Sequence, residues 1–415
     1  MGMIVNIDEA LKLRSDYNVL QEPLKKMMED QYEAWERENP IDLLFKRGSL
    51  ASFQETFTSS IGFDHAFSEV SDYSVGPIFN TAEGFSATYT SKEFRGRFIV
   101  SKLALEERKY GSIKDEADAF VRRWTGDLVE YCMKSIEGGF GKPGKAAEKV
   151  EWTPTTTGAT SSLWLNSADT EDGDITNVNK VSLFNKAHTT VKRKDGDEVI
   201  KQANMYRACD NVASPTDTSS IQIDGSDPLY IAKLADLINV VITAMENYRD
   251  DNGKRAGVLG AKAIVAPNEP HLKAALQAAL SLQEINGLPN TAFQRATLDT
   301  TPYLNDIGPC KDGAGFFIVD RGYNAANHGL EFTERVPMTM SVYETKDPDG
   351  VTHSARQRMD TNCATWRGIT YVRIKNTVAS NPKAYEDKAN FETIKPLATA
   401  KPVSVVGTVN TKAST

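Results

Sequence analysis

One segment, from Phe85 to Gly139, constrains the fold of this chain more than any other. A strand-like arm (Phe85–Val100) leads through a charged turn (Glu106–Gly111) into one long amphipathic helix over Ile113–Glu137. Two glycines then end the predicted helix. An extended arm that leads into a long helix is poorly suited to an isolated globular domain. It suits a subunit that reaches over its neighbours.

The long helix carries a single apolar stripe, because its apolar residues recur at steps of three and four. The stripe consists of Ile113, Ala117, Phe120, Val121, Trp124, Leu128, Cys132 and Ile136. We predict that this stripe, with Phe120, Trp124 and Leu128 at its centre, packs against a core.

The arm is predicted to form a hairpin. Phe85–Thr90 and Arg97–Val100 are strand-like, and the polar residues between them favour a turn. Phe94, Phe98 and Val100 share one face at period two. Two interpretations stay open, because the hairpin can lie on the body of its domain or project from it. The residues predicted to contact neighbouring subunits are Trp35, Phe85, Tyr89, Phe94 and Phe98.

The first segment, Met1–Gly48, is predicted to be mainly helical and is strongly charged. Pro23 is placed at a helix start and Asn39-Pro40 at its end. The apolar stripe of this helix is narrow, so we expect it to lie against another surface of its own domain or of a neighbouring subunit.

The remaining pattern predicts an α+β fold. The stretch Gly138–Ile223 is loop-rich, with short apolar islands at Leu163–Leu165 and Val181–Phe184. After it come a helix with Asp227 as N-cap, a buried strand, an Ala-rich helix and a second buried strand, followed by strands alone. The two helices span Asp227–Arg249 and Pro270–Leu282, and the two buried strands span Ala263–Ala266 and Phe316–Val319. The later strands span Val336–Tyr343 and Ala364–Ile374, with a turn at Asp347–Gly350 between them.

Composition narrows the class of protein. The 415 residues are enough for two or three domains. The net charge of −8 argues against a protein that binds nucleic-acid phosphates over much of its surface. No apolar run approaches the roughly 20 residues of a membrane helix. The N-terminus lacks signal-peptide features. We therefore expect a soluble protein made in a cytoplasm.

Catalytic chemistry has little support in the sequence. The four cysteines form no C-x-x-C pair, and the five histidines, His188 among them, are dispersed. The glycine-rich run after Gly138 follows a helix, whereas a phosphate-binding loop follows a strand. We predict no enzyme activity, no catalytic residue, no cofactor and no metal site.

Several motifs in a fixed order resemble tailed-bacteriophage major capsid proteins, particularly Mu-like head subunits. They lie within residues 53–376 and comprise Phe98–Glu106 before the long helix, Leu183-Phe-Asn-Lys-Ala-His188, Asp250-Asp-Asn-Gly-Lys254, Ala263–Asn268 and Ala364–Tyr371. The resemblance implies a Hong Kong 97-like fold, with an N-terminal arm, an extended loop, a peripheral domain that carries the long spine helix, and an axial domain.

On this resemblance the chain divides into six parts. They are an N-terminal arm (1–52), an extended loop region (53–100), a peripheral domain with the spine helix (101–226), an axial domain (227–335), return strands of the peripheral domain (336–380) and a C-terminal tail (381–415).

The resemblance implies a major capsid protein that self-assembles into the hexamers and pentamers of an icosahedral shell around double-stranded DNA. It implies location in the virion capsid, assembly in the host bacterial cytoplasm, and portal, scaffold and decoration proteins as partners. The shell would enclose DNA without sequence-specific binding, and no membrane is involved. Two alternatives stay open: an encapsulin-type nanocompartment shell, and a soluble enzyme with a site in residues 138–223.

Overall fold

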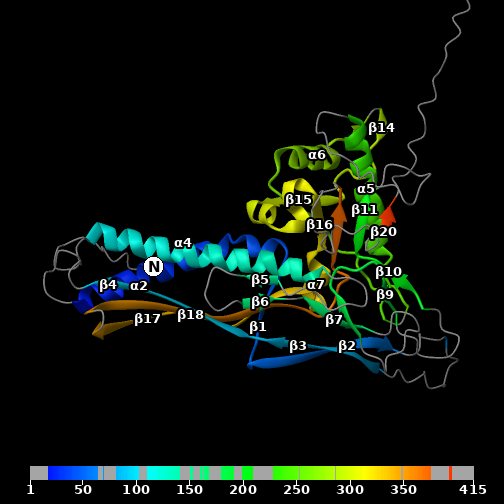
Figure 1. Cartoon of the computed structure of the whole chain (residues 1–415). Coiled ribbons are helices and arrows are strands. Elements are labelled where there is room, and N and C mark those ends of the chain that lie inside the picture. The colour runs from blue at the N-terminus through cyan, green and yellow to red at the C-terminus, as the bar shows by residue number, and fades with distance from the viewer. Residues whose placement is uncertain are drawn as a thin grey trace, which may run out of the picture.

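The chain forms an upright body that rises from one end of an elongated platform (Figure 1). This computed structural model describes residues 17–63, 69, 81–101, 110–140, 150–152, 159–161, 163–167, 179–190, 199–208, 228–251, 253–285, 287–346, 349–374 and 392–394. Helices and strands both contribute to each body, so the predicted α+β class is confirmed.

The platform is built on a four-stranded sheet. Its strand order is β1-β17-β18-β4, with β1 parallel to β17 and the other neighbours antiparallel. The strands span Lys46–Ser49 (β1), Leu330–Lys346 (β17), Asp349–Cys363 (β18) and Lys92–Ser101 (β4).

Two long helices, α2 (Tyr17–Arg37) and α4 (Tyr110–Ser135), pack against one face of this sheet. A 3₁₀ turn (η2, Ile136–Gly139) follows α4. The predicted helix Ile113–Glu137 is therefore confirmed to within three residues at each end. The helices and the sheet share a small core of Leu24, Met28 and Tyr32 from α2, Ile113, Ala117 and Val121 from α4, and Val100 from β4.

The prediction that Pro23 starts the first helix is wrong, because α2 already begins at Tyr17 and contains Pro23. A proline near a helix start removes one backbone donor, and the buried Leu24 and Met28 that follow it hold this part of the helix on the platform. The predicted break at Asn39 is confirmed. The Asn39 side chain caps a 3₁₀ helix (η1, Pro40–Leu43) by accepting a 2.8 Å hydrogen bond from the Ile41 amide.

The predicted hairpin between Phe85 and Val100 is also wrong. One residue, Ser91, separates β3 (Thr81–Thr90) from β4, and the two strands enter different sheets. β3 pairs with β2 (Gln54–Phe63), whereas β4 pairs with β18. The polar residues placed in a turn belong to a strand with one open face. The shared face of Phe94, Phe98 and Val100 is confirmed, since these side chains pack towards the helices.

Sequence reasoning missed β18 entirely. The strand predicted at Ala364–Ile374 is shorter, as β19 (Ile369–Arg373), and the strand at Val336–Tyr343 extends to both sides as β17. β18 shows little hydrophobic alternation because several of its buried residues are polar, including Thr352, His353 and Gln357.

The upright body is centred on a six-stranded sheet in the order β15-β12-β16-β19-β11-β20. The predicted strands at Ala263–Ala266 and Phe316–Val319 are confirmed as β12 and β16, all of whose residues are buried. The predicted Ala-rich helix is confirmed as α6 (Pro270–Ser281) and the preceding helix as α5 (Pro228–Glu246). The residue predicted to cap the N-terminus of α5, Asp227, lies outside the described residues. The strands span Ala296–Thr301 (β15), Lys262–Pro267 (β12), Gly315–Asp320 (β16), Met205–Ala208 (β11) and Glu392–Ile394 (β20).

Shorter elements complete the described chain. Both apolar islands predicted in the loop-rich stretch contribute to paired strands, β7 and β8. The short strands are β5 (Val150–Trp152), β6 (Ala159–Ser161), β7 (Trp164–Ser167), β8 (Asn179–Ser182), β9 (His188–Thr189), β10 (Lys201–Gln202), β13 (Glu284–Ile285) and β14 (Leu288–Pro289). The short helices are η3 (Pro302–Asp306), η4 (Gly308–Gly313) and α7 (Arg321–Ala326).

The six predicted sequence divisions stay a prediction, and strand pairing in both bodies crosses their boundaries. The six-stranded sheet takes β11 and β19 from outside residues 227–335, and α2 and β1 of the predicted N-terminal arm belong to the platform. Strand pairing joins residues that are far apart in sequence, which a division in chain order cannot express.

The contact between α4 and β4 depends on a glycine. A Cβ atom at Gly96 would lie 2.9 Å from Cζ3 of Trp124, so the helix could not keep its present distance from the sheet. The Trp124 indole also donates a 3.1 Å hydrogen bond to the Gln357 side chain of β18.

We expect Trp124→Ala to lower the free energy of unfolding by about 3 kcal/mol, because it empties the space above Gly96 and leaves the Gln357 oxygen without its donor. Urea unfolding of the unassembled chain measures this. Arg122→Ala, on the exposed face of the same helix, is the matched control and should change stability little. Equal stability of Trp124→Ala and the control would contradict the packing described here.

Candidate assembly surfaces

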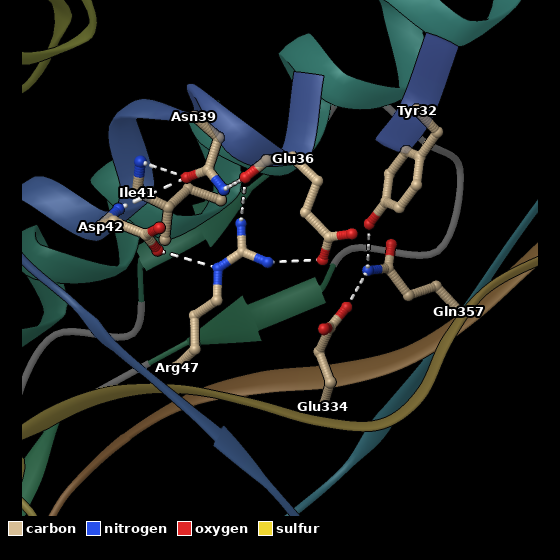
Figure 2. A network of polar contacts seen from close by, with 8 residues as sticks. All are labelled: Tyr32, Glu36, Asn39, Ile41, Asp42, Arg47, Glu334 and Gln357. Carbon is tan, nitrogen blue, oxygen red and sulfur yellow. Dashed lines mark hydrogen bonds and ion pairs between the residues drawn. The ribbon is translucent and has the colours of Figure 1, made fainter. Parts of the chain in front are cut away.

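A buried amide connects the elements of the platform. Gln357 of β18 accepts from Trp124 of α4, and its Nε2 donates to the Tyr32 hydroxyl of α2 at 3.2 Å and to Glu334 of β17 at 2.5 Å. Figure 2 shows Tyr32 and Glu334 converging on the amide nitrogen. Burial raises the pKa of the Glu334 carboxyl above its ordinary value. Two helices and two strands thus meet at one side chain.

A second set of contacts ties the end of α2 to β1. Arg47 donates to Asp42 at 2.9 Å through Nε, to the Glu36 carboxylate at 2.5 Å, and to the Glu36 carbonyl at 3.1 Å (Figure 2). Charge-assisted bonds from one planar guanidinium fix both partners in direction as well as distance. The chain leaving α2 is therefore held against the edge of the sheet.

Four of the five side chains predicted to contact neighbouring subunits have partners inside this chain. Tyr89 is 1% exposed and packs 4.7 Å from the Phe57 ring. Phe94 meets Tyr131 edge-on, Phe98 lies 5.1 Å from Phe120, and Trp35 lies 5.6 Å from Tyr32. Phe85 is partly exposed. A role for these residues between subunits stays a prediction.

The residues predicted to form the centre of the helix stripe lie on the sheet side of α4. Leu128 is buried in the larger core, while Phe120 and Trp124 are partly buried against the smaller one. The larger core continues from the C-terminal half of α4 into the upright body. The helix therefore joins the two bodies.

Exposed apolar side chains were not predicted from the sequence. Among the described residues, the large ones are Phe53, Leu259, Leu282, Leu288 and Tyr343. Leu282 precedes β13 and Leu288 begins β14, and β14 lies at the top of the upright body in Figure 1. Tyr343 lies near the far end of β17 on the platform. The extremities of both bodies thus expose apolar groups.

His188, the histidine considered for catalysis, is buried. Its ring stacks on Trp366 at 4.2 Å and lies 3.1 Å from the Asn204 side-chain oxygen. Burial, with a further contribution from the nearby positive charge of Arg367, lowers the pKa of His188 to about 3. A histidine kept neutral and packed between side chains has a structural role.

The described residues hold no group of three or more His, Cys, Asp or Glu side chains arranged for a metal ion. An open depression of about 670 Å³ lies between the β9–β10 region and the end of α5. Its lining, which includes Lys186, Tyr206 and Arg249, contains no carboxylate, histidine or cysteine in the described part of the chain.

Where the helices are described, none combines the length and the apolarity that crossing a membrane requires.

No protein-family profile matches the chain, and no curated protein matches it in sequence. Solved structures do. A structure of Mycobacterium phage Patience is 11% identical, with 91% of this chain and 93% of that chain covered and a TM-score of 0.42. The mature capsid of bacteriophage PhiM1 is 9% identical, with 81% and 86% covered and a TM-score of 0.41. A virus-like particle from Pyrococcus furiosus is 11% identical, with 85% and 98% covered and a TM-score of 0.38.

These similarities agree with the resemblance predicted from the sequence.

We expect the buried, neutral His188 to make stability depend on pH. The unfolded chain binds a proton at this residue below about pH 6.5 and the folded chain does not until about pH 3. The free energy of unfolding should therefore fall as pH decreases from 6.5, by at most about 1.4 kcal/mol per pH unit from this group.

Urea unfolding of the unassembled chain between pH 7 and pH 5 checks this, with His188→Gln as the comparison. The variant should show a smaller pH slope whatever its stability at pH 7. Histidine NMR supplies a direct control, since a His188 ring that titrates near pH 6.5 in the folded chain would contradict the prediction.

Proposed function

We propose that this chain is the major capsid protein of a tailed bacteriophage and forms the hexamers and pentamers of an icosahedral shell. The observation that carries the proposal is the β2–β3 ribbon. Its two ten-residue strands pair only with each other in the described part of the chain. An isolated two-stranded ribbon is marginally stable in water. A ribbon of this length needs another surface along its outer half.

Among the described residues, the base of the ribbon packs on the platform, and β3 also lies against β7. At the base Tyr89 is buried, and Phe57 stacks on the His328 ring at 4.5 Å. This anchoring fixes the direction in which the ribbon leaves the platform, since β3 continues directly into β4 of the sheet. A ribbon with a fixed direction, whose strands pair only with each other in the described part of the chain, fits a contact with a neighbouring subunit.

The upright body supports the same proposal. Its tip exposes Leu282 and Leu288, 44% each. Exposed apolar groups at the end of a rigid body favour association, and such tips converge at the centre of a ring of subunits. Closed rings with one repeated contact are the expected result of head-to-tail association.

The proposal extends to the partners and the location that the sequence resemblance implies. The shell encloses double-stranded DNA without reading its sequence, which suits a chain with net charge −8. Portal, scaffold and decoration proteins join it. The chain assembles in the host bacterial cytoplasm and is located in the virion capsid. Its role is structural, with no catalytic centre.

Assembly itself is the first test. We expect purified chain to form closed particles of megadalton mass, because every subunit presents the same ribbon and the same tip. Mass photometry and negative-stain images measure this. Species no larger than a hexamer at all protein and salt concentrations would contradict the proposal. Particle contents separate the alternatives, since enclosed protein cargo in place of DNA would favour a nanocompartment shell.

The ribbon provides the second test. Thr58 and Ser86 lie directly opposite each other in the β2–β3 pairing. Replacing residues 59–85 by Asn-Gly should therefore close a tight hairpin and remove the outer half without disturbing β4. We expect a folded chain, with an unfolding midpoint close to that of the parent, that forms no closed shell.

The matched control is Arg122→Ala on the exposed face of α4. It leaves both the ribbon and the tip of the upright body intact, and we expect it to close shells as the parent does. If the ribbon-trimmed chain assembled as efficiently as the parent, the ribbon would have no role in shell closure.

A further inference from the structure

The depression between the β9–β10 pair and the end of α5 combines an apolar floor with a cationic rim. Its volume of about 670 Å³ is in the range of ligand pockets. The cations that line it are Lys186, Lys201 and Arg249. The apolar lining consists of Ala187, Ile200, Ala203, Tyr206, Ala244 and Tyr248.

The backbone of Arg249 is held in place by two other side chains. Gln202 of β10 accepts a hydrogen bond from the Arg249 amide at 2.6 Å and donates one to its carbonyl at 3.2 Å. Arg367 donates to the same carbonyl at 2.7 Å. The Arg249 guanidinium itself donates to the Gly253 carbonyl at 2.7 Å. The cation is therefore positioned before any ligand arrives, which lowers the entropy cost of binding.

The nearby carboxylates are bound to other arginines. Asp251 pairs with Arg367 at 2.6 Å, and Glu246 pairs with Arg295 at 2.8 Å. Lys201 and Arg249 are both exposed, and neither has an ion pair with a described residue. The rim of the depression thus carries positive charge, although the net charge of the chain is −8.

We propose that the depression binds a peptide segment of another protein in which carboxylates alternate with apolar side chains. The carboxylates pair with Arg249 and Lys201, and an apolar side chain covers the floor around Ala203 and Ala244. A guanidinium has five N–H donors, and the bond to the Gly253 carbonyl uses one of those of Arg249. The donors that remain can take a carboxylate with two parallel hydrogen bonds.

This binding activity goes beyond the proposed shell function, because it concerns a contact that each subunit makes with a different protein. It is measured on the purified chain before assembly. Formation of shells and binding of the peptide can therefore fail independently of each other.

A peptide fits the depression better than double-stranded DNA does. Duplex DNA presents phosphates on a convex surface and has no apolar side chain to place in a hollow, and its affinity comes mainly from phosphate contacts with many cations. A small inorganic anion would satisfy Arg249 and leave the apolar floor uncovered. Only a ligand with both kinds of group uses both parts of the lining.

Fluorescence polarisation tests the proposal with a labelled synthetic peptide, Gly-Glu-Leu-Glu-Leu-Glu-Gly, as the probe. We expect saturable binding that the double variant Lys201→Glu with Arg249→Glu weakens at least about tenfold, because the rim then repels the carboxylates. The matched control, Lys273→Glu with Lys311→Glu, reverses two exposed cations of the upright body that do not line the depression. It should bind as the parent does.

Two further probes separate charge from apolar contact. In one, glutamine replaces every glutamate of the peptide, and in the other, serine replaces every leucine. We expect each probe to bind the parent at least about tenfold more weakly, because each keeps only one of the two kinds of contact. Raising the salt concentration from about 0.05 M to about 0.5 M should weaken binding of the original peptide.

Each variant is checked for a cooperative unfolding transition before binding is scored. If the double variant fails to fold, Lys201→Glu alone replaces it, since Lys201 is exposed and has no ion pair with a described residue. The replacement keeps the hydrogen bonds of Gln202 with the Arg249 backbone. Its expected effect is a weakening of at least about threefold.

No binding by the parent at up to about 1 mM peptide would overturn the inference. So would equal binding by the rim variant, or equal binding of the glutamine or serine probe. Displacement of the peptide by inorganic phosphate or a short DNA duplex at the same concentration would show a general anion site instead. Self-association of the chain that Lys201→Glu abolishes would replace the foreign peptide by a second copy.

Discussion

The platform depends on one buried amide, that of Gln357. Its side chain lies among Trp124, Tyr32 and Glu334, from two helices and a neighbouring strand. A buried amide that loses a partner costs about 1–3 kcal/mol, so the network tolerates few other positions of the helices on the sheet. Apolar contacts alone are less directional, and the core shared by α2, α4 and β4 is small. The amide thus sets where both helices lie.

Fixing the helices also fixes the direction of the arm. Trp124 packs on Gly96 of β4, which pairs with β18 in the sheet, and β4 continues through Ser91 into β3. The orientation of the ribbon is therefore inherited from the packing of α4 on the sheet. A contact made by the outer part of the ribbon would be positioned by interactions near the middle of the platform. The packing of α4 on the sheet thus directs a long arm that has no core of its own.

Elements that bury apolar side chains could be predicted from the sequence. Strands that bury polar side chains, or that carry charged side chains on one face, could not. The stripe of α4 and the buried strands β12 and β16 follow from simple periodicity. β18 does not, because Gln357 and His353 are buried through hydrogen bonding and ring stacking with residues far away in sequence. Arg95 and Glu93 suggested a turn, but they are the exposed side of a strand whose other side packs on a helix.

The predicted contact residues Tyr89, Phe94 and Phe98 find partners within the chain, and their role between subunits stays a prediction. The sum of the charges is −8. A net charge averages over the surface, however, and conceals a stretch without lysine or arginine, residues 54–90, and the arginines of the paired strands β4 and β18, which are Arg95, Arg97, Arg356 and Arg358. For a subunit of the proposed shell, a separation of charge is more informative than the total, because attraction between unlike regions selects a head-to-tail contact while repulsion between like regions disfavours the symmetric one.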